Sequence, residues 1–308
     1  MKRKVIQIAD STQLISLPRK WAQKYGVKKG DEIEVEEMGS RIIISTDRGT
    51  LTDELTVDVS GLTPLLVDRF IARSYQKGYD KIKIRFDDPK LMLGVQDKIP
   101  ELMGFEIMEK SKNSCDIQIL SSKLEIDFDS ALRRAFLTIL DIANATLLDF
   151  KNGDKEALKT LEHKDLEVNK FCYFCLRAIN KGRHEGFGTY ALHYLIESLE
   201  DLGDEYKELT KILVKMQTNK KNDFCDLLRD INNVAKLCYE FFYKPEKQKA
   251  VQILSMYKDA EKRIENLLKT DHTMVEIKAL IRMWHIMEIL YKFPTIRLDT
   301  LKELTKTN

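Results

Sequence analysis

Three carboxylates in the second half of the chain are the strongest candidates for chemistry. Glu200 and Asp204 are four residues apart, so in a helix they share one face, about one turn apart. Carboxylates at this spacing repel each other weakly, which a bound cation, a basic neighbour or simple hydration would offset. Asp165 lies on the preceding predicted helix, from which it can converge on this face. Hard oxygen ligands favour iron, manganese, magnesium or calcium over copper, and a solvated acidic stripe is the alternative.

Two cysteines and three histidines are weaker candidates. Cys172 and Cys175 form a CxxC motif on an apolar helix face with no second pair, so buried packing is favoured over a redox or zinc role. His163, His193 and His285 lie on predicted helices near acidic positions, and for each a histidine satisfied at a packing interface is favoured over a ligand. No Ser/His/Asp or Cys/His arrangement carries a local signature, so the sequence predicts a protein that is not an enzyme.

The candidate ligands lie in a region whose apolar pattern is helical throughout, from Asp127 to the end. Apolar residues three and four apart predict six helices: Ala131–Phe150, Lys155–Asn180, Thr189–Met216, Asp223–Phe242, Lys247–Leu268 and Val275–Phe293. The short polar breaks between them are typical of antiparallel bundles. Gly203 in mid-helix, which costs about 1 kcal/mol relative to alanine, indicates close approach by another helix.

An internal repeat divides the six helices into two sets of three. The run 163–167 (HKDLE) is echoed by 257–261 (YKDAE), and Leu199-Glu200 is echoed by Met287-Glu288. Two tandem three-helix bundles are the expected architecture.

The repeat also aligns the second bundle with the candidate ligands of the first. Asp259 is then paired with Arg263, and Glu288 with Lys292, so a cation stands at each second position. We expect ion pairs rather than a metal there, Lys292 beside Asp259 and Arg263 beside Glu288.

The helical region resembles the PhoU family of phosphate-signalling proteins over residues 128–293. The similar runs are Leu199-Glu200-Asp201-Leu202-Gly203-Asp204, Asn152-Gly153-Asp154-Lys155-Glu156-Ala157 and Asp165-Leu166-Glu167-Val168-Asn169. The resemblance implies paired three-helix bundles, negative regulation of phosphate uptake and signalling, and metal clusters held by acid pairs spaced by three residues. Carried over to this chain, it implies a divalent metal or iron in the first bundle, at Asp165, Asn169, Glu200 and Asp204.

Charge is distributed unevenly along the chain. Residues 1–30 hold eight Lys and Arg against Asp10 alone, a net charge of +7, and the whole chain is only +2, so the remainder is acidic. A compact basic region suggests a polyanionic partner, and simple solubility of a short domain is an equally good explanation.

The basic region also has the pattern of a small β domain. We expect strands Lys4–Ile8 and Leu14–Leu17 around an Asp10-Ser11-Thr12 turn, helix Arg19–Tyr25 between Pro18 and Gly26, and strands Glu32–Glu36 and Ile42–Ser45 around Gly39. A β-β-α-β-β unit of about fifty residues buries little core, and domains of this size often complete one by dimerising.

This region resembles the AbrB/SpoVT family of swapped-hairpin DNA-binding domains over about residues 3–46. The similar runs are 14–22 (LISLPRKWA), 26–35 (GVKKGDEIEV) and 39–44 (GSRIII). The resemblance implies a homodimer in which two intertwined chains form one β barrel, with a basic face laid against DNA. The candidate DNA contacts are Arg3, Lys4, Arg19, Lys20 and Lys24.

Residues 50–126 are expected to form a small α/β sandwich. The predicted order is β-α-β-α-β-β, with elements at Leu55–Val59, Thr63–Lys77, Lys81–Phe86, Asp88–Met103, Glu106–Glu109 and Cys115–Leu120. The glycines of this region stand alone and form no phosphate-binding loop, so a dimerising spacer is the favoured role.

Together these patterns predict a multidomain α+β protein of 308 residues, with domains at 1–49, 50–126 and 127–308. No apolar run approaches the roughly 20 residues of a membrane span, and no signal peptide is evident. Five scattered cysteines suit a reducing compartment, so we expect a cytoplasmic protein without membrane insertion.

The combination of domains is similar to that of archaeal phosphate-uptake regulators. It implies a DNA-binding transcriptional regulator linked to phosphate uptake or signalling, with DNA, a second copy and phosphate-transport or signalling proteins as partners. An adaptor that docks on a phosphate transporter or kinase, and uses the N-terminal domain only to dimerise, is the main alternative. Metal storage is a third possibility, which the cations in the second bundle weaken.

Overall fold

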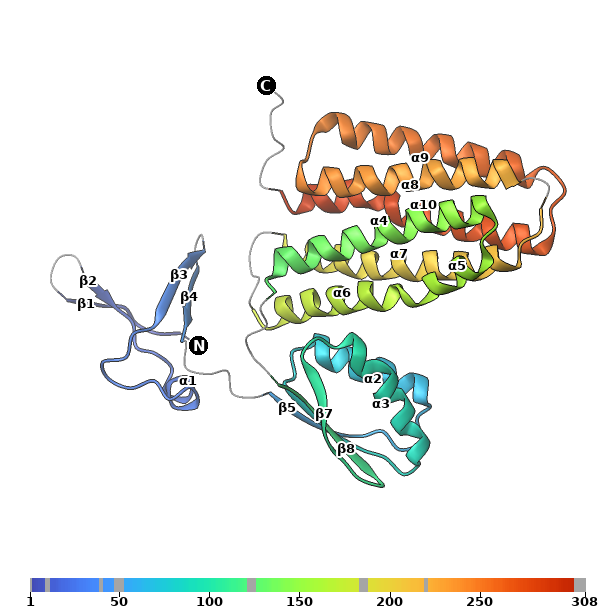
Figure 1. Ribbon diagram of the computed structural model, residues 1–308. Coiled ribbons are helices and arrows are strands. Elements are labelled where there is room, and N and C mark those ends of the chain that lie inside the picture. Colours follow the sequence, from blue (N-terminus) through green and yellow to red (C-terminus); the bar gives the residue numbers. More distant parts are fainter. Residues whose placement is uncertain are drawn as a thin grey trace. The chain divides into compact units, whose positions relative to one another are not determined.

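The computed structural model describes residues 2–8, 12–38, 41–46, 53–120, 126–182, 188–218 and 221–301. The chain divides into two compact units, Met1–Glu54 and Leu55–Asn308, here called the head and the body. The architecture is mixed α+β, with a small N-terminal β region followed by a mostly helical part (Figure 1). The predicted boundary at residue 49 lies outside the described residues, and the predicted α/β and helical domains belong to one unit.

The head consists of two hairpins and one short helix. Its elements are β1 (Ile6–Ile8), β2 (Thr12–Leu14), α1 (Arg19–Lys24), β3 (Glu34–Met38) and β4 (Arg41–Ser45). β1 pairs antiparallel with β2, and β3 with β4, in two separate two-stranded sheets. The expected order is confirmed, whereas the barrel is not, because no closed sheet forms within the described part of one chain. The turns predicted at Asp10-Ser11 and at Gly39 lie outside the described residues.

The body begins with an α/β domain. Its elements are β5 (Glu54–Asp58), α2 (Pro64–Gln76), β6 (Lys81–Arg85), α3 (Met92–Lys98), β7 (Phe105–Lys110) and β8 (Ser114–Ile119). The strand order is β5-β6-β8-β7, with β8 antiparallel to both neighbours and Ile117 opposite Ile82 and Ile107. α2 and α3 lie on one face of this sheet (Figure 1), where alternate strand residues such as Ile82 and Ile84 are buried.

The helix predicted at Asp88–Met103 is shorter in the structure, and Pro89 and Pro100 lie in the two segments that flank it. Only Met92–Lys98 is α-helical, and the segments Pro89–Leu91 and Ile99–Glu101 are 3₁₀ turns. Pro100 supplies no N–H to continue the ladder, so the helix ends before it. Gly94 lets α3 approach α2 closely, since a Cβ there would lie 2.1 Å from the carbonyl oxygen of Pro64.

The rest of the body is helical. Its helices are α4 (Phe128–Asn152), α5 (Lys155–Thr160), α6 (Asp165–Asn180), α7 (Thr189–Lys215), α8 (Lys221–Tyr243), α9 (Lys247–Leu268) and α10 (Met274–Asp299). A 3₁₀ turn at Leu161–His163 separates α5 from α6, so the predicted helix Lys155–Asn180 is two helices. α4, α6 and α7 pack together, as do α8, α9 and α10, which gives two three-helix sets.

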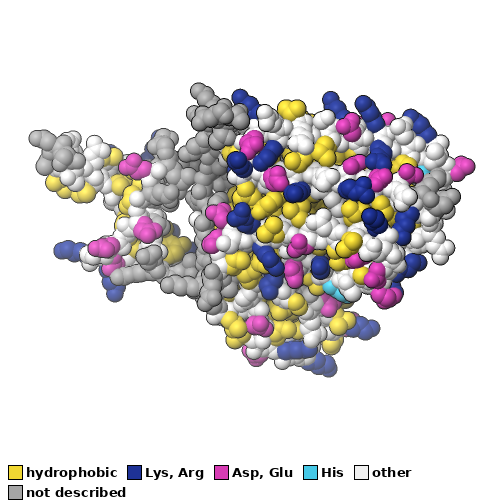
Figure 2. All heavy atoms as spheres, turned by 45° about the horizontal axis from the view of Figure 1, so that its top comes forward, with side chains coloured by type: hydrophobic (Ala, Val, Ile, Leu, Met, Phe, Trp, Pro, Cys, Tyr) yellow, Lys and Arg dark blue, Asp and Glu magenta, His cyan; other side chains and the backbone are white. Residues whose placement is uncertain are grey.

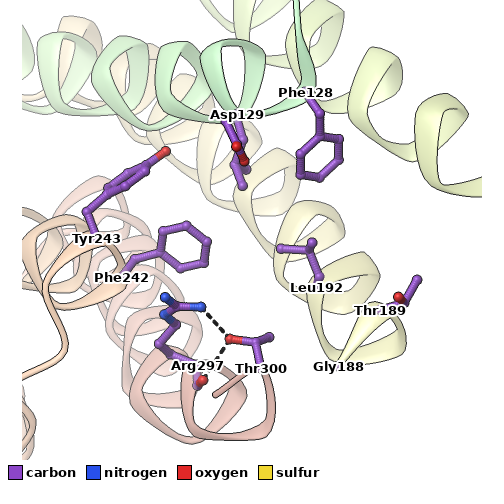
Figure 3. A pocket seen from close by; sticks show the side chains of 10 residues that line it. Phe128, Asp129, Gly188, Thr189, Leu192, Phe242, Tyr243, Arg297 and Thr300 are labelled. Carbon is purple, nitrogen blue, oxygen red and sulfur yellow. Dashed lines mark hydrogen bonds between the residues drawn. The ribbon is translucent and has the colours of Figure 1, made fainter. Parts of the chain in front are cut away.

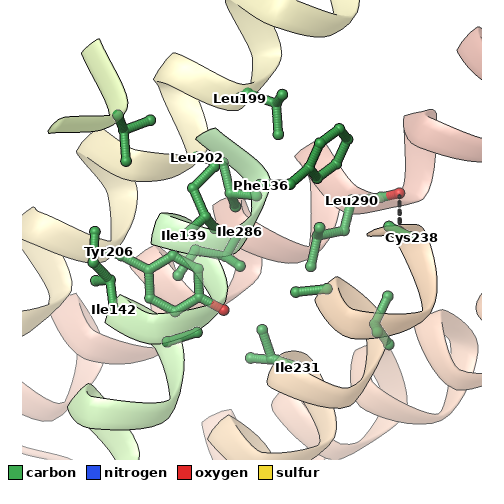
Figure 4. Close-up of a cluster of buried hydrophobic side chains, with 14 of the residues drawn as sticks. Phe136, Ile139, Ile142, Leu199, Leu202, Tyr206, Ile231, Cys238, Ile286 and Leu290 are labelled. Carbon is green, nitrogen blue, oxygen red and sulfur yellow. Dashed lines mark hydrogen bonds between the residues drawn. The ribbon is translucent and has the colours of Figure 1, made fainter. Parts of the chain in front are cut away.

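The two sets share one hydrophobic core instead of having one each. α7 packs on α10 and α4 on α8, and a single buried cluster runs from Ala131 to Ile296. Figure 4 shows this cluster where Phe136 of α4, Tyr206 of α7 and Ile231 of α8 converge. The Tyr206 hydroxyl donates to Asn232 Oδ1, and Asn232 donates to the Ala143 carbonyl, so these polar atoms inside the core are paired.

α10 is longer than the sequence predicts, because it continues through Pro294 to Asp299. Pro294 has no N–H for the carbonyl four residues earlier, that of Leu290. The thiol of Cys238 on α8 donates to that carbonyl at 3.6 Å (Figure 4). A partner from another helix thus replaces the missing bond.

The expectation for Gly203 is confirmed. A Cβ at this position of α7 would lie 3.2 Å from Cγ1 of Val168 on α6, so the absence of a side chain sets the spacing of these helices. Among the helices that the structure describes, none combines the length and apolar character needed to cross a membrane.

Candidate functional site

The four candidate metal ligands lie where α6 and α7 pack together, with a lysine among them. The ammonium of Lys207 donates to Asp165 and to Asp204. Burial lowers the pKa of Lys207, but these hydrogen bonds outweigh burial and raise it above its usual value. Lys207 therefore supplies a positive charge that offsets the carboxylates of Asp165 and Asp204.

Glu200 has a different set of neighbours. It accepts a hydrogen bond from the hydroxyl of Tyr173 on α6 at 3.1 Å. Burial raises the pKa of Glu200 to about 7, and the nearby carboxylates of Asp204 and Glu197 raise it further, against the lowering effect of the Tyr173 hydrogen bond. This side chain changes charge near neutral pH.

Asn169 faces the α/β domain. Its Nδ2 donates to Glu101 at 3.0 Å, and its Oδ1 is buried without a hydrogen-bond partner among the described residues. Glu101 also accepts from Lys98 at 2.8 Å, and Lys98 lies 3.4 Å from Asp68 and 5.5 Å from the ring of Tyr173. This face of α6 is thus covered by a network of charges from α2, α3 and the 3₁₀ turn after α3.

A second cluster fixes the other end of α6 to the same domain. Arg177, which is 5% exposed, donates to the carbonyls of Tyr75 and Tyr79 at 2.8 and 2.7 Å and pairs with Asp80. Lys181 adds an ion pair to Asp80 at 2.7 Å. These residues are not among the candidates predicted from the sequence, although an arginine within an apolar stretch of a predicted helix is a signal of a buried polar partner.

As arranged, the four candidates do not form a ligand set. Within the described ranges, no group of three or more His, Cys, Asp or Glu side chains is placed to hold a metal ion. Asn169 Oδ1, which has no hydrogen-bond partner among the described residues, could coordinate a cation. A cation at Asp165 and Asp204, however, would have to displace the Lys207 ammonium. Metal binding stays a prediction that requires this displacement.

The cysteines and histidines, the weaker candidates, lie in different environments. Cys172 and Cys175 are buried, as expected for packing, and burial raises the pKa of both thiols, which keeps them protonated and unreactive. His163 is exposed on the 3₁₀ turn, and His285 lies 3.6 Å from Glu205. His193 is half-buried on α7.

The ion pairs predicted for the second bundle are wrong. Arg263 pairs with Asp230 of α8 at 2.8 Å and lies 3.5 Å from Asp226, instead of meeting Glu288. Glu288 accepts from the hydroxyl of Tyr257 at 2.6 Å. Asp259 and Lys292 are exposed, with no ion pair between them in the described structure. Arg263 points toward α8, whereas the prediction required the side of α9 that faces α10.

The five candidate DNA contacts are all solvent-exposed: Arg3, Lys4, Arg19, Lys20 and Lys24. None of them forms an ion pair with another described residue. Trp21 of α1 and Tyr25, which follows the helix, are half-buried and pack with ring centroids 5.4 Å apart. Arg19 and Lys20 are exposed on the same helix, and Lys24 Nζ lies 5.2 Å from the centroid of the Tyr25 ring. On the body, Figure 2 shows basic and acidic side chains interspersed across the visible face. With eight lysines and arginines against one acid in residues 1–30, the head is the better candidate for a polyanion surface.

Comparison with known proteins finds a family match within the head. Residues 6–50 match the family model described as "Antidote-toxin recognition MazE, bacterial antitoxin". The N-terminal region is a MazE/AbrB-like domain. The phosphate transport system regulatory protein PhoU from Streptococcus pneumoniae has a similar crystal structure, at 14% identity and a TM-score of 0.48, covering 58% of this chain and 96% of that one. No curated protein matches the chain.

Proposed function

We propose that this protein is a DNA-binding transcriptional regulator of the cytoplasm, whose head binds DNA and whose body responds to phosphate status. The observation that carries the DNA-binding part is the MazE/AbrB-like domain with five exposed cations. Lys and Arg that neutralise DNA phosphates release counterions, which supplies most of the non-specific affinity of such proteins.

The link to phosphate rests on the sequence motifs of residues 128–293, which resemble the PhoU family. On this proposal the body conveys phosphate status to the head, in the manner of the archaeal phosphate-uptake regulators that the chain resembles. Phosphate-transport or signalling proteins are the partners expected for the body.

A homodimer is part of the proposal. No described side chain of the head is buried, and several of its large apolar residues are exposed, for example Val35 by 59% and Ile42 by 66%. A second copy is the partner that a swapped-hairpin domain requires to bury such residues.

The test is the salt dependence of DNA affinity of the full chain, measured by fluorescence anisotropy with a random-sequence duplex. Arg19→Ala with Lys20→Ala should weaken binding at every salt concentration. It should also reduce the slope of log K against log salt by about 0.9 for each DNA phosphate that is no longer neutralised. Lys258→Ala with Lys262→Ala, two lysines of α9 on the body, is the charge-matched control and should change neither quantity.

Equal binding by the wild type and both double variants would contradict the proposal and leave the adaptor as the better interpretation. The phosphate part is tested separately by genome-wide DNA occupancy in phosphate-rich and phosphate-starved cells. Occupancy that is the same in both conditions would remove phosphate from the proposal without affecting DNA binding.

A further inference from the structure

A cavity of about 360 Å³ lies where the two three-helix sets meet. It is formed by the starts of α4 and α7 and by the ends of α8 and α10 (Figure 3). Gly188, at φ +80°, brings the start of α7 against the end of α10, because a Cβ there would lie 2.7 Å from Cα of Thr300. The cavity is therefore built by close helix packing.

Arg297 in the last turn of α10 is the unusual residue of this cavity. Its guanidinium donates to Thr300 Oγ1 at 2.6 Å and lies 4.5 Å from the ring centroid of Phe242. Its Nε is buried with no hydrogen-bond partner, and no carboxylate in the described structure pairs with it. The negative end of the α10 dipole and the aromatic face favour a cation here, but neither supplies an acceptor for Nε.

The other walls restrict what could provide that acceptor. Leu132, Leu192 and Phe242 are buried apolar side chains of the lining. Asp129, in the first turn of α4, lines the wall across from Arg297 (Figure 3). A ligand that pairs with Arg297 thus needs an apolar portion, and a second negative charge near Asp129 would be repelled.

We propose that this cavity binds a small carboxylate with a compact apolar body, whose carboxylate pairs with Arg297 and whose apolar part lies against Leu132, Leu192 and Phe242. Arginine presents N–H groups in a planar fork that matches a carboxylate, so a small shift of the Arg297 side chain toward the cavity would let the ligand satisfy Nε together with a terminal nitrogen. The carboxylate could belong to a simple acid or to an apolar amino acid, whose ammonium would face Asp129. Because the cavity joins both helix sets, the ligand would act as an effector of the body, and the inference does not depend on DNA binding.

Isothermal titration calorimetry of the full chain with three related compounds tests the proposal. Isocaproate carries the carboxylate alone, L-leucine adds the ammonium, and isoamylamine has the ammonium alone. We expect isocaproate and L-leucine to bind and isoamylamine not to bind. Arg297→Met should weaken both carboxylates at least about tenfold, as expected for loss of a charge-assisted pair. Arg282→Met, on the same helix outside the cavity, is the matched control and should leave both affinities unchanged.

Asp129→Asn distinguishes the two sources. If L-leucine binds more tightly than isocaproate to the wild type and loses this advantage in Asp129→Asn, the ligand is an amino acid. If the two compounds bind alike to the wild type and to Asp129→Asn, the ligand is a simple acid. Either outcome supports the proposal. Inorganic phosphate, which has no apolar part, should bind more weakly than isocaproate.

Three results would overturn the inference: no binding of either carboxylate up to about 10 mM, affinities unchanged by Arg297→Met, or tighter binding of phosphate than of isocaproate. If Arg297→Met does not fold, the Nε–H resonance of Arg297 in the wild type decides. It should shift on addition of isocaproate and not of isoamylamine, and an unmoved resonance counts against the site.

Discussion

Burial determines the acid–base behaviour of Glu200. In the unfolded chain this carboxyl titrates near its ordinary value, whereas in the folded protein its pKa is about 7. The folded state therefore binds the proton more tightly. Stability is highest below the unfolded pKa and falls as pH rises toward the folded pKa, by on the order of 3 kcal/mol once both states are ionised.

Glu200→Gln should relieve this cost, because glutamine keeps the shape and can still accept the hydrogen bond from Tyr173. We expect the free energy of unfolding to rise by on the order of 2–3 kcal/mol near pH 8 and to change little near pH 4. Urea unfolding at the two pH values measures the difference. Glu167→Gln, an exposed position of α6, is the control. An equal effect of Glu200→Gln at both pH values would argue against the raised pKa.

The metal prediction also belongs to the residue scale, where it becomes a competition with Lys207. We predict that a divalent metal or iron binds at Asp165, Asn169, Glu200 and Asp204 when the ammonium of Lys207 moves away. Lys207→Met should therefore raise the metal content of protein purified without chelator, and Glu200→Gln with Asp204→Asn should abolish it. Elemental analysis that finds the same content in all three proteins rules the site out.

Local spacing made part of this cluster predictable. Residues four apart on one helix share a face in any tertiary context, so Glu200 and Asp204 could be placed together, and Gly203 marked the contact with α6. The choice of partner is not local. Lys207, three residues after Asp204, could be placed beside it by the same spacing, but its bond to Asp165 of α6 could not. Likewise Arg263 was expected beside Glu288 of α10, although it faces α8.

At the scale of elements, α6 is joined to the α/β domain by Arg177. Arg177→Met would remove two hydrogen bonds to buried carbonyls and leave Asp80 with Lys181 as its remaining partner in this cluster. Breaking a buried ion pair from one side costs about 3–5 kcal/mol, and we expect a loss of this size in urea unfolding.

Arg229→Met on α8 is the matched control for Arg177. Arg229 is half-exposed and pairs with Asp226 three residues earlier, so its loss should cost only about 0–1 kcal/mol. Similar losses for the two variants would show that the Arg177 cluster does not hold the domain in place.

Helix positions were predicted well because the 3.6-residue period is a property of the chain alone. The helix breaks and ends were predicted less well. The last helix was predicted to end at Phe293, before Pro294, but α10 continues to Asp299. The carbonyl of Leu290, which Pro294 leaves without its usual N–H partner, accepts a hydrogen bond from Cys238 of α8. The break between α5 and α6 has no glycine or proline to mark it, so an uninterrupted helix was expected.

At the scale of the whole molecule, the exposed apolar residues of the head predict self-association. The full chain of 35.9 kDa should sediment as at least a dimer. Val35→Lys should shift the equilibrium toward monomer, because a charge would then have to be buried with the strands of the partner. Met274→Lys, at an exposed apolar position of the body, should not. A monomer at all concentrations in sedimentation equilibrium would contradict the swapped-hairpin interpretation.

The sequence also predicted the regions of the molecule better than the contacts between them. Apolar periodicity identifies which face of an element is buried, but not which other face covers it. For this reason the α/β region was expected to be a separate spacer, although Tyr173 of α6 is part of its core. The two helix sets were likewise expected to be tandem units, although they share one cluster.

The junction of Arg177, Asp80 and Lys181 has a consequence for inheritance. A recombination event that replaced only the α/β domain with one lacking an acid at position 80 would leave the guanidinium of Arg177 with backbone carbonyls but no carboxylate. The hybrid would carry a buried, unneutralised charge and would be selected against. Across descendants of this chain, residues 55–182 should therefore be inherited as one block, with Asp80 and Arg177 changing together. The head, which is a separate compact unit, remains free to be exchanged.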